Sequence, residues 1–323
     1  MTFTAAERCL PNSSFDCAEA KFTKENAKHW PDVPFDQYCA PGTECKNRYS
    51  PSFWSRKRIT DITTEVRSGT AYQKADSWKL THQFPSTGDG SSPALWLASV
   101  TRTGHTGTAA SLPAVTFLGT QLKNRVDTTG DGIPPLIRYR VSAVNTESGG
   151  TVAVTYSAPE CTPGSLPAEA SNTKRCYPVF WSSPDSPAAD YKPVKDWFHK
   201  YVVTRVLEND LVGGSPTQQT DYTYVGGAAW AKSEDQFTKA AHRTYSDFRG
   251  YGEVRTQVGN GIDGTRLDSR TRYFRGIEGA KVADFEGNEV ADHPAFAGIE
   301  RAEATYDGGT LIEEETSTPW RKG

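Results

Sequence analysis

The chain has 323 residues but only one methionine, and it lacks the features that mark several classes of protein. No apolar stretch approaches the roughly 20 residues that a membrane-spanning helix needs. Lys and Arg form no long run, and a net charge of −3 gives no electrostatic footprint for nucleic acid. The start, MTFTAAERCL, lacks the basic and apolar regions of a signal peptide. We expect no membrane span and no nucleic-acid partner; the protein is either cytosolic or a piece of a longer chain.

Motifs of several enzyme classes are also missing. There is no GxSxG nucleophile turn, no GxxxxGK[ST] phosphate loop and no HExxH zinc motif. The histidines, at positions 29, 82, 105, 199, 242 and 293, show no metal spacing. His82 lies in an alternating strand pattern, which is typical of a packed or surface side chain. The charge run Glu313-Glu314-Glu315 is typical of a solvated face. Since no pair stands out among the 39 acids either, we predict no enzyme, no catalytic residue and no cofactor.

Six cysteines, at positions 9, 17, 39, 45, 161 and 176, bear on the compartment. Four crowd into the first segment among Pro and Gly, and the other two flank the Pro-rich loop 162–175. None forms a CxxC pair or lies at zinc-finger spacing. An even number in loop-rich surroundings favours disulfides and an oxidising compartment. The alternative is six thiols in a cytosolic protein. We expect Cys161–Cys176 to be the first pair, closing its own loop.

What the sequence does contain is aromatic rings and turn residues. It has 8 Trp, 14 Tyr and 14 Phe, together with 28 Gly and 20 Pro, which favours strands joined by tight turns. Strand patterns occur at residues 59–66, 78–84, 95–101, 136–144, 151–156, 201–207, 220–225, 253–258 and 270–274. Loops rather than long amphipathic helices separate them. We therefore predict an all-β fold of mostly antiparallel hairpins, because parallel strands need long crossovers.

Two hairpins have clear signals. In Leu136–Val144 apolar and polar residues alternate, residues 147–150 (ESGG) turn, and residues 151–156 alternate back. Near the end, EATYDGGTLI (303–312) places Asp307-Gly308-Gly309 between two strand candidates, and these residue types tolerate positive φ.

Composition also divides the chain into three predicted regions. Residues 1–55 are expected to be an irregular cysteine-rich segment, with a short helix near 18–30, because Pro residues break it repeatedly. Residues 56–215 are expected to form a β-rich domain with a disulfide-loop insertion near 157–195. Residues 216–323 complete the chain as a further hairpin region.

A weak repeat appears in the last third. Tyr224, Tyr245 and Tyr306 each precede a turn with glycine, at separations of 21 and 61 residues, close to one and three copies of a unit of about 20. Together with the segments around Phe53–Thr60 and Asp196–Tyr201, this resembles the Rhs/YD-repeat proteins of actinobacteria, which are related to the teneurins. Their motif is Tyr-Asp, two residues, Gly, then Arg or Asn and an apolar residue.

The match to that family has departures. Tyr306-Asp307-Gly308-Gly309-Thr310-Leu311 has its Gly one place early and Thr in the Arg position, and residues 245–254 are a looser copy. Residues 124–127 and 138–156 resemble the segment that precedes the YD array, similar to the linker region of SpvB-like and Tc-toxin-like proteins. The self-cleaving core and the toxin that follow the array in the family are missing.

The resemblance implies a structural role. It implies a curved sheet or partial shell, in which stacked tyrosines line one face, and a secreted or cell-wall-associated protein whose shell encapsulates a C-terminal effector. Partners are then the rest of a longer chain or its enclosed toxin. This chain is expected to be a degenerate or internal piece of such a protein, without catalysis of its own.

Two further readings remain open. Asp127-Thr128-Thr129-Gly130-Asp131-Gly132 has the start of a calcium loop, but Arg138 stands where a bidentate Glu is needed, so an Asp-Gly turn is favoured and we assign no metal ligand. The alternative function is a secreted β-sandwich module that binds cell-surface carbohydrate through exposed rings. Solvent-facing, coplanar rings favour that alternative, whereas buried rings favour the shell.

Overall fold

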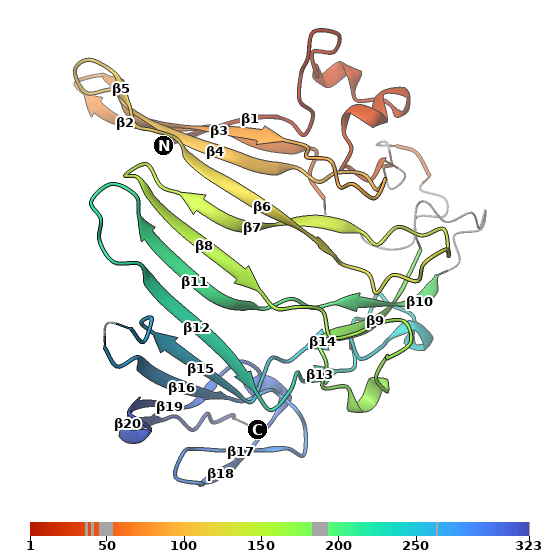
Figure 1. Ribbon diagram of the computed structural model, residues 1–323. Coiled ribbons are helices and arrows are strands. Elements are labelled where there is room, and N and C mark those ends of the chain that lie inside the picture. The colour runs from red at the N-terminus through yellow and green to blue at the C-terminus, as the bar shows by residue number, and fades with distance from the viewer. Residues whose placement is uncertain (36–37, 40–41, 45–53, 183–192, 263, 323) are drawn as a thin grey trace. The chain divides into compact units, whose positions relative to one another are not determined.

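The computed structural model describes residues 1–323 apart from 36–37, 40–41, 45–53, 183–192, 263 and 323. Strands make up 46% of it and helices 6%, and the described helices are all short 3-10 turns. Fourteen strands belong to one sheet of antiparallel strands (Figure 1). The predicted all-β, mostly antiparallel fold class is therefore confirmed.

The chain divides into two compact units, which are described separately. The first unit is Met1–Leu122 with Leu136–Thr151, and the second is Lys123–Pro135 with Val152–Gly323. The predicted boundaries near residues 55 and 215 remain predictions.

The first unit contains a meander, in which each strand lies beside the next one along the chain. Its order is β1-β2-β3-β4-β6-β7, and β5 pairs with β4 off this path. The bounds are β1 Thr2–Glu7, β2 Lys57–Ser68, β3 Ala71–Gln83, β4 Trp96–Gly104, β5 Ala110–Ser111, β6 Val115–Lys123 and β7 Ile137–Asn145.

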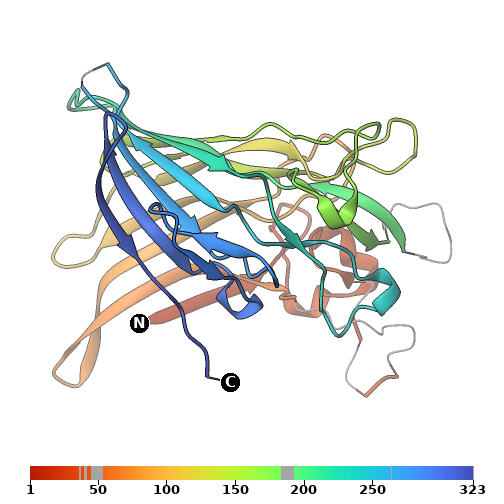
Figure 2. The ribbon, with the colours of Figure 1, turned by 90° about the horizontal axis from the view of Figure 1, so that it is seen from below.

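The second unit continues the same kind of order, β8-β11-β12-β15-β16-β19-β20. Its bounds are β8 Gly150–Tyr156, β11 Val203–Asp210, β12 Gln218–Val225, β15 Glu253–Val258, β16 Leu267–Tyr273, β19 Glu300–Asp307 and β20 Thr310–Thr316. Three small two-stranded sheets interrupt it: β9 Cys176–Trp181 with β10 Val194–His199, β13 Trp230–Ala231 with β14 Asp247–Phe248, and β17 Lys281–Ala283 with β18 Glu289–Ala291. The strands of this unit twist, so its sheet is curved (Figure 2).

The core consists of small separate clusters. In the first unit Cys9, Trp30 and Val33 are buried together. The second unit has three clusters, which are Val126, Cys161, Cys176 and Trp197; Ala228, Trp230 and Tyr251; and Phe274, Val282 and Phe296. Rings rather than flexible aliphatics dominate them, and local packing stabilises each group.

The irregular N-terminal segment is more ordered than the sequence indicated. β1 pairs antiparallel with β2, although Thr2–Glu7 is short and was expected to be irregular. The helix expected near 18–30 is instead two 3-10 turns, η1 Glu19–Lys21 and η2 Lys24–His29. Thr23, between them, is extended (φ −128°, ψ 164°), which prevents one continuous helix.

Two disulfides are placed. Cys161–Cys176, the predicted pair, is confirmed, and Cys9–Cys17 forms a second one. Cys39 is also disulfide-bonded, and Cys45 lies outside the described residues. The oxidised state predicted from the cysteine pattern is therefore the state of the described cysteines.

The two hairpins predicted from sequence are present. Gly308 (φ 53°) and Gly309 (φ 92°) form the two-residue connection between β19 and β20, where Asp307 pairs with Thr310. Successive positive φ angles match the strand twist, as expected for this loop length.

Strand β6 was not predicted, and its Gly119 lies against aromatic rings: a Cβ added at this position would meet Tyr139 at 2.7 Å and Trp96 at 3.2 Å.

Candidate functional site

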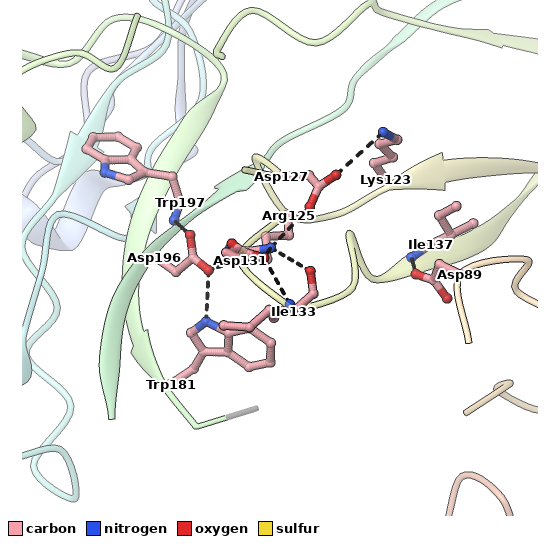
Figure 3. Close-up of polar contacts among 10 residues, drawn as sticks. All are labelled: Asp89, Lys123, Arg125, Asp127, Asp131, Ile133, Ile137, Trp181, Asp196 and Trp197. Atoms are coloured by element: carbon pink, nitrogen blue, oxygen red, sulfur yellow. Dashed lines mark hydrogen bonds and ion pairs between the residues drawn. The ribbon is translucent and has the colours of Figure 1, made fainter. Parts of the chain in front are cut away.

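A cluster of charged side chains surrounds the buried guanidinium of Arg125, in the second unit (Figure 3). The side chain of Arg125 is 4% exposed and forms ion pairs with Asp127, Asp131 and Asp196. Its Nη1 lies 3.2 Å from Asp127 Oδ1 and donates to the Ile133 carbonyl across 2.9 Å. One guanidinium therefore has three carboxylates as partners, which compensates for its loss of hydration.

Backbone bonds hold this cluster together. Val126 N donates to the Trp197 carbonyl across 2.8 Å, and Arg125 N donates to the Pro135 carbonyl across 3.0 Å. These bonds fix the segment 123–135 against β10, which carries Asp196. Trp181 on β9 donates its indole N–H to the same Asp196 carboxylate across 3.3 Å. The cluster thus joins the segment 123–135 to the β9–β10 pair, which lies far from it in the sequence.

The arrangement bears directly on the calcium-loop reading. Asp127 and Asp131, the first and fifth positions of that pattern, both face the guanidinium of Arg125. The Arg125 hydrogen bond lowers the pKa of Asp131. Asp131 Oδ1 also accepts from the Ile133 N–H across 2.9 Å, as in an Asp turn. The Arg125 guanidinium therefore occupies the position between the two carboxylates that a metal ion needs. Within the described residues, no group of three or more His, Cys, Asp and Glu side chains can hold a metal.

A second set of charges lies on one face of the second unit's sheet. We call it the charged face, and it consists of Arg205, Asp221, Glu253, Arg255, Asp268, Arg270 and Arg272. Register places them together: Arg205 pairs with Asp221, and Arg255 pairs with Arg270. Because side chains alternate along a strand, positions two apart share this face.

Carboxylates and guanidinium groups alternate across the charged face. Arg255 binds Asp268 through two hydrogen bonds of 2.8 and 2.6 Å, and Arg272 Nε donates to Glu253 across 2.9 Å. The hydrogen bond from Arg205, 2.5 Å long, is the largest contribution that lowers the pKa of Asp221 to about 2, and hydrogen bonds from Gln219 and Arg266 add to it. Hydrogen bonds from arginines lower the pKa of Asp221 and that of Asp268, so neither carboxyl is placed to act as a general acid near neutral pH.

Rings complete the charged face. The guanidinium of Arg270 lies 4.1 Å from the ring centroid of Tyr306, and that of Arg272 lies 4.2 Å from the centroid of Phe285. Stacking of this kind stabilises each pair by about 0.5–1 kcal/mol at exposed sites. A face made of ion pairs and stacked arginines differs from an apolar core face, and it remains compatible with water.

The predicted tyrosine stack is not the arrangement found. Tyr224 lies against Tyr251, with ring centroids 4.7 Å apart, whereas Tyr306 contacts Phe285 and Arg270. Strand register explains the difference: Tyr306 pairs with Asp268 on the charged face, whereas Tyr224 pairs with Val254, whose side chain lies on the opposite face of the sheet. Tyr224 and Tyr245, 21 residues apart, both pack against the cluster of Ala228, Trp230 and Tyr251, whereas Tyr306 lies away from them.

Among the histidines, His293 lies near a carboxylate: its Nε2 is 4.0 Å from Oε2 of Glu278, whose side chain is 75% exposed. On β3, His82 Nδ1 lies 3.3 Å from Arg58 Nη1, and burial together with that guanidinium lowers the pKa of His82. Burial also lowers the pKa of His199. Ser77 Oγ lies 2.7 Å from His105 Nε2, but we find no carboxylate bound to this imidazole within the described chain. A Ser–His contact without an orienting acid lacks the third element of the catalytic triad.

The tryptophans predicted to be either packed or sugar-facing are packed. Trp197 and Trp230 are buried, and Trp54, Trp78, Trp96 and Trp181 are half-buried. Trp320, near the end of the chain, is 85% exposed, but it is a single ring. A sugar platform needs several coplanar solvent-facing rings.

One glycine pattern was overlooked in the sequence. Gly259, Gly261 and Gly264 have the GxGxxG spacing of a dinucleotide-binding loop. In the structure they follow β15 and lead into the antiparallel strand β16 rather than a helix. Because the phosphate-binding version needs a helix N-terminus after the loop, these glycines form a hairpin connection.

Comparison with protein-family models, with curated proteins and with solved structures found no match for this chain. Within the described part of the chain, no helix is both long and apolar enough to span a membrane.

Proposed function

We propose that this chain is a structural segment of a secreted Rhs/YD-repeat polymorphic-toxin-like protein, contributing part of the β-sheet wall that encapsulates a C-terminal effector. The observation that carries the proposal is the strand order. In each unit, successive sheet strands follow the chain as a meander, and extra strands are inserted between them as small hairpins. A wall can grow by adding hairpins in this way, because each strand needs only its neighbours.

The charged face supports the same role. A wall has two solvated faces, whereas a β-sandwich buries one face of each sheet against the other. In the second unit, one face carries Arg255–Asp268 and Arg272–Glu253 ion pairs instead of a continuous apolar layer. Because these carboxylates form ion pairs with arginines, they also favour a protein without catalysis of its own.

The disulfides support an oxidising location, either secreted or cell-wall associated. Cys9–Cys17 and Cys161–Cys176 persist only where thiols are not kept reduced. The carbohydrate-binding alternative has less support, because the six tryptophans that it relied on are half-buried or buried.

Hydrogen exchange at the sheet edge tests the proposal. β20 ends the strand order of the second unit. We expect those amides of 310–316 that point away from β19 to exchange rapidly in the isolated chain and to become protected in the natural full-length polypeptide, where the next hairpin pairs with β20. Amides of β15, which has neighbours on both sides, serve as the internal control. Equal exchange at β20 in both proteins contradicts the proposal, as does a full-length polypeptide without further hairpins and effector.

A further inference from the structure

The second unit contains a cavity of about 520 Å³ that neither the wall nor the charged face explains. This volume falls within the range of ligand-binding pockets, about 300–1,000 Å³. Its apolar lining is formed by side chains from separate parts of the unit, namely Val202, Tyr224, Phe248, Tyr251, Val254 and Tyr273. The floor is well fixed, because Tyr251 is buried and packs against Tyr224 and Phe248.

The polar groups of the cavity carry no net charge. Asp247 and Arg249 line it and pair with each other, with Arg249 Nη2 2.6 Å from Asp247 Oδ2. The Asp247 side chain is 46% exposed and that of Arg249 19%, so both are accessible from solvent. A neutral donor–acceptor pair favours an uncharged partner that offers both an N–H and a C=O, because an ionic ligand meets one like charge. A peptide amide has this chemistry.

The strand beside the cavity has an open edge. β14 contributes both of its residues, Asp247 and Phe248, to the lining, and it belongs to a two-stranded sheet with β13. Within the described residues no further strand pairs with β14. Because β14 has two residues and successive residues bond to opposite sides, its unpaired side offers the N–H and C=O of one residue to an extended peptide, while a pocket accepts one of the peptide's side chains.

From these observations we propose that the cavity beside β14 binds an extended, uncharged peptide segment, which inserts one large apolar side chain between Tyr224, Phe248 and Val254. The inserted side chain is aromatic or branched aliphatic, since the lining is mostly rings. The open edge of β14 and the Asp247–Arg249 pair hold the peptide backbone. This inference does not depend on the proposed function, because the second unit's own residues form the whole cavity.

Fluorescence anisotropy with a labelled nonapeptide, GSTVFVTSG, tests the site on the full chain. We expect saturable binding, and replacement of the central Phe by Ala to weaken binding at least about tenfold, because a large buried side chain is lost. Replacement of the same Phe by Asp is expected to abolish it. Affinity that does not depend on the central residue contradicts the proposal.

Filling the cavity gives a matched pair of variants. Val254→Phe places a ring in the cavity, whereas Val258→Phe makes the same change four residues along β15, outside this cavity. We expect at least a tenfold loss with Val254→Phe and no change with Val258→Phe, with circular dichroism confirming that both variants fold. If Val254→Phe fails to fold, Asp247→Lys takes its place: it is expected to shift preference toward peptides with acidic flanks.

Competition identifies other occupants. The proposal would be overturned if methyl glucoside or octanol displaced the peptide while Val254→Phe left the peptide affinity unchanged. Those two results together would indicate a small-molecule site or surface adsorption. Unchanged charge preference in Asp247→Lys also contradicts it, because the rim then does not contact the peptide.

Discussion

Arg125 donates from Nε to the carboxylate of Asp196, and this ion pair links the segment Lys123–Pro135 to strand β10. The two residues are 71 positions apart in the sequence. Since the guanidinium is almost fully buried and also binds Asp127 and Asp131, the pair is the centre of a network rather than an isolated contact. Its loss leaves three carboxylates facing one another.

Replacement of Arg125 by Met is therefore expected to be strongly destabilising. Removing one partner of a buried charge network costs about 3–5 kcal/mol of the free energy of unfolding. Urea denaturation followed by tryptophan fluorescence measures the change. The matched control is Arg205→Met, which removes a guanidinium with 47% side-chain exposure that pairs with Asp221; there we expect a small effect. Equal effects in both variants would show that burial of Arg125 is energetically unimportant.

Calcium is expected not to bind at Asp127 and Asp131. The Arg125 guanidinium already compensates for the charge of both carboxylates, and a metal ion has to displace it. Calorimetric titration of the wild-type chain with calcium chloride should give no binding heat, and the melting temperature should not change. Saturable heat that is lost in Asp131→Asn contradicts this expectation.

The two disulfides are expected to contribute unequally to stability. Cys161–Cys176 spans 15 residues and Cys9–Cys17 spans 8. A chain-entropy treatment gives about 3 kcal/mol for the longer loop and about 2.5 kcal/mol for the shorter. Both disulfides lie in buried clusters, Cys161 and Cys176 with Val126 and Trp197 and Cys9 with Trp30 and Val33. Replacement by Ala therefore removes buried surface in both variants, and the loop length sets the expected order. Denaturation of the two double-Ala variants measures how much stability each disulfide contributes. A larger loss of stability in the variant without Cys9–Cys17 contradicts the expected order.

Acid should weaken the charged face through Asp221. Hydrogen bonds from Arg205, Gln219 and Arg266 together lower its pKa in the folded state to about 2, against about 3.9 in an unfolded chain. A carboxyl with a lowered folded pKa stabilises the fold above its unfolded pKa, and this contribution is lost as pH falls through the folded value. We expect the melting-temperature difference between wild type and Asp221→Asn to shrink from about pH 5 to about pH 2.

The control for that titration is Asp307→Asn. Asp307 is exposed in the β19–β20 hairpin, and its substitution should give a difference that changes little with pH. A wild-type advantage over Asp221→Asn that persists unchanged at about pH 2 would show that the carboxylate charge is not what stabilises the sheet.

Regular alternation made much of the fold predictable. The pattern in residues 253–258 and 136–144 corresponds to β15 and β7, within one or two residues. By contrast, β9 (CYPVFW) is an apolar run without alternation, and it pairs with β10 along all six of its residues. Local sequence does not determine such a pairing.

The charged clusters were only partly visible in the sequence. Charges two apart, as in Glu253 and Arg255 or in Asp268, Arg270 and Arg272, share one face of a strand, and this signal could have located the charged face. The Arg125 cluster could not be found in this way, because Asp196 is distant in sequence. The Asp-Thr-Thr-Gly-Asp pattern indicated a metal loop or a turn, and the deciding partner, Arg125, lies just before it.

The turn between β19 and β20 depends on backbone conformation, and this can be tested at two adjacent glycines. Gly309 has φ 92° and Gly308 has φ 53°, and an added Cβ meets no atom at either position. Substitution there changes strain rather than packing. Valine at position 309 is expected to cost about 1–3 kcal/mol locally, because β-branched residues are outliers at positive φ. Asn tolerates the left-handed region, so Gly308→Asn should have little effect.

Amide hydrogen exchange of residues 310–316 measures the strain where it acts. In Gly309→Val we expect faster exchange throughout β20 with little change in β15, since β20 pairs with β19 through this turn. Gly308→Asn should exchange like the wild type. If both variants exchange equally fast, an added side chain of any kind disturbs the turn and the left-handed requirement is wrong; if neither changes, strand pairing alone determines the register of this hairpin.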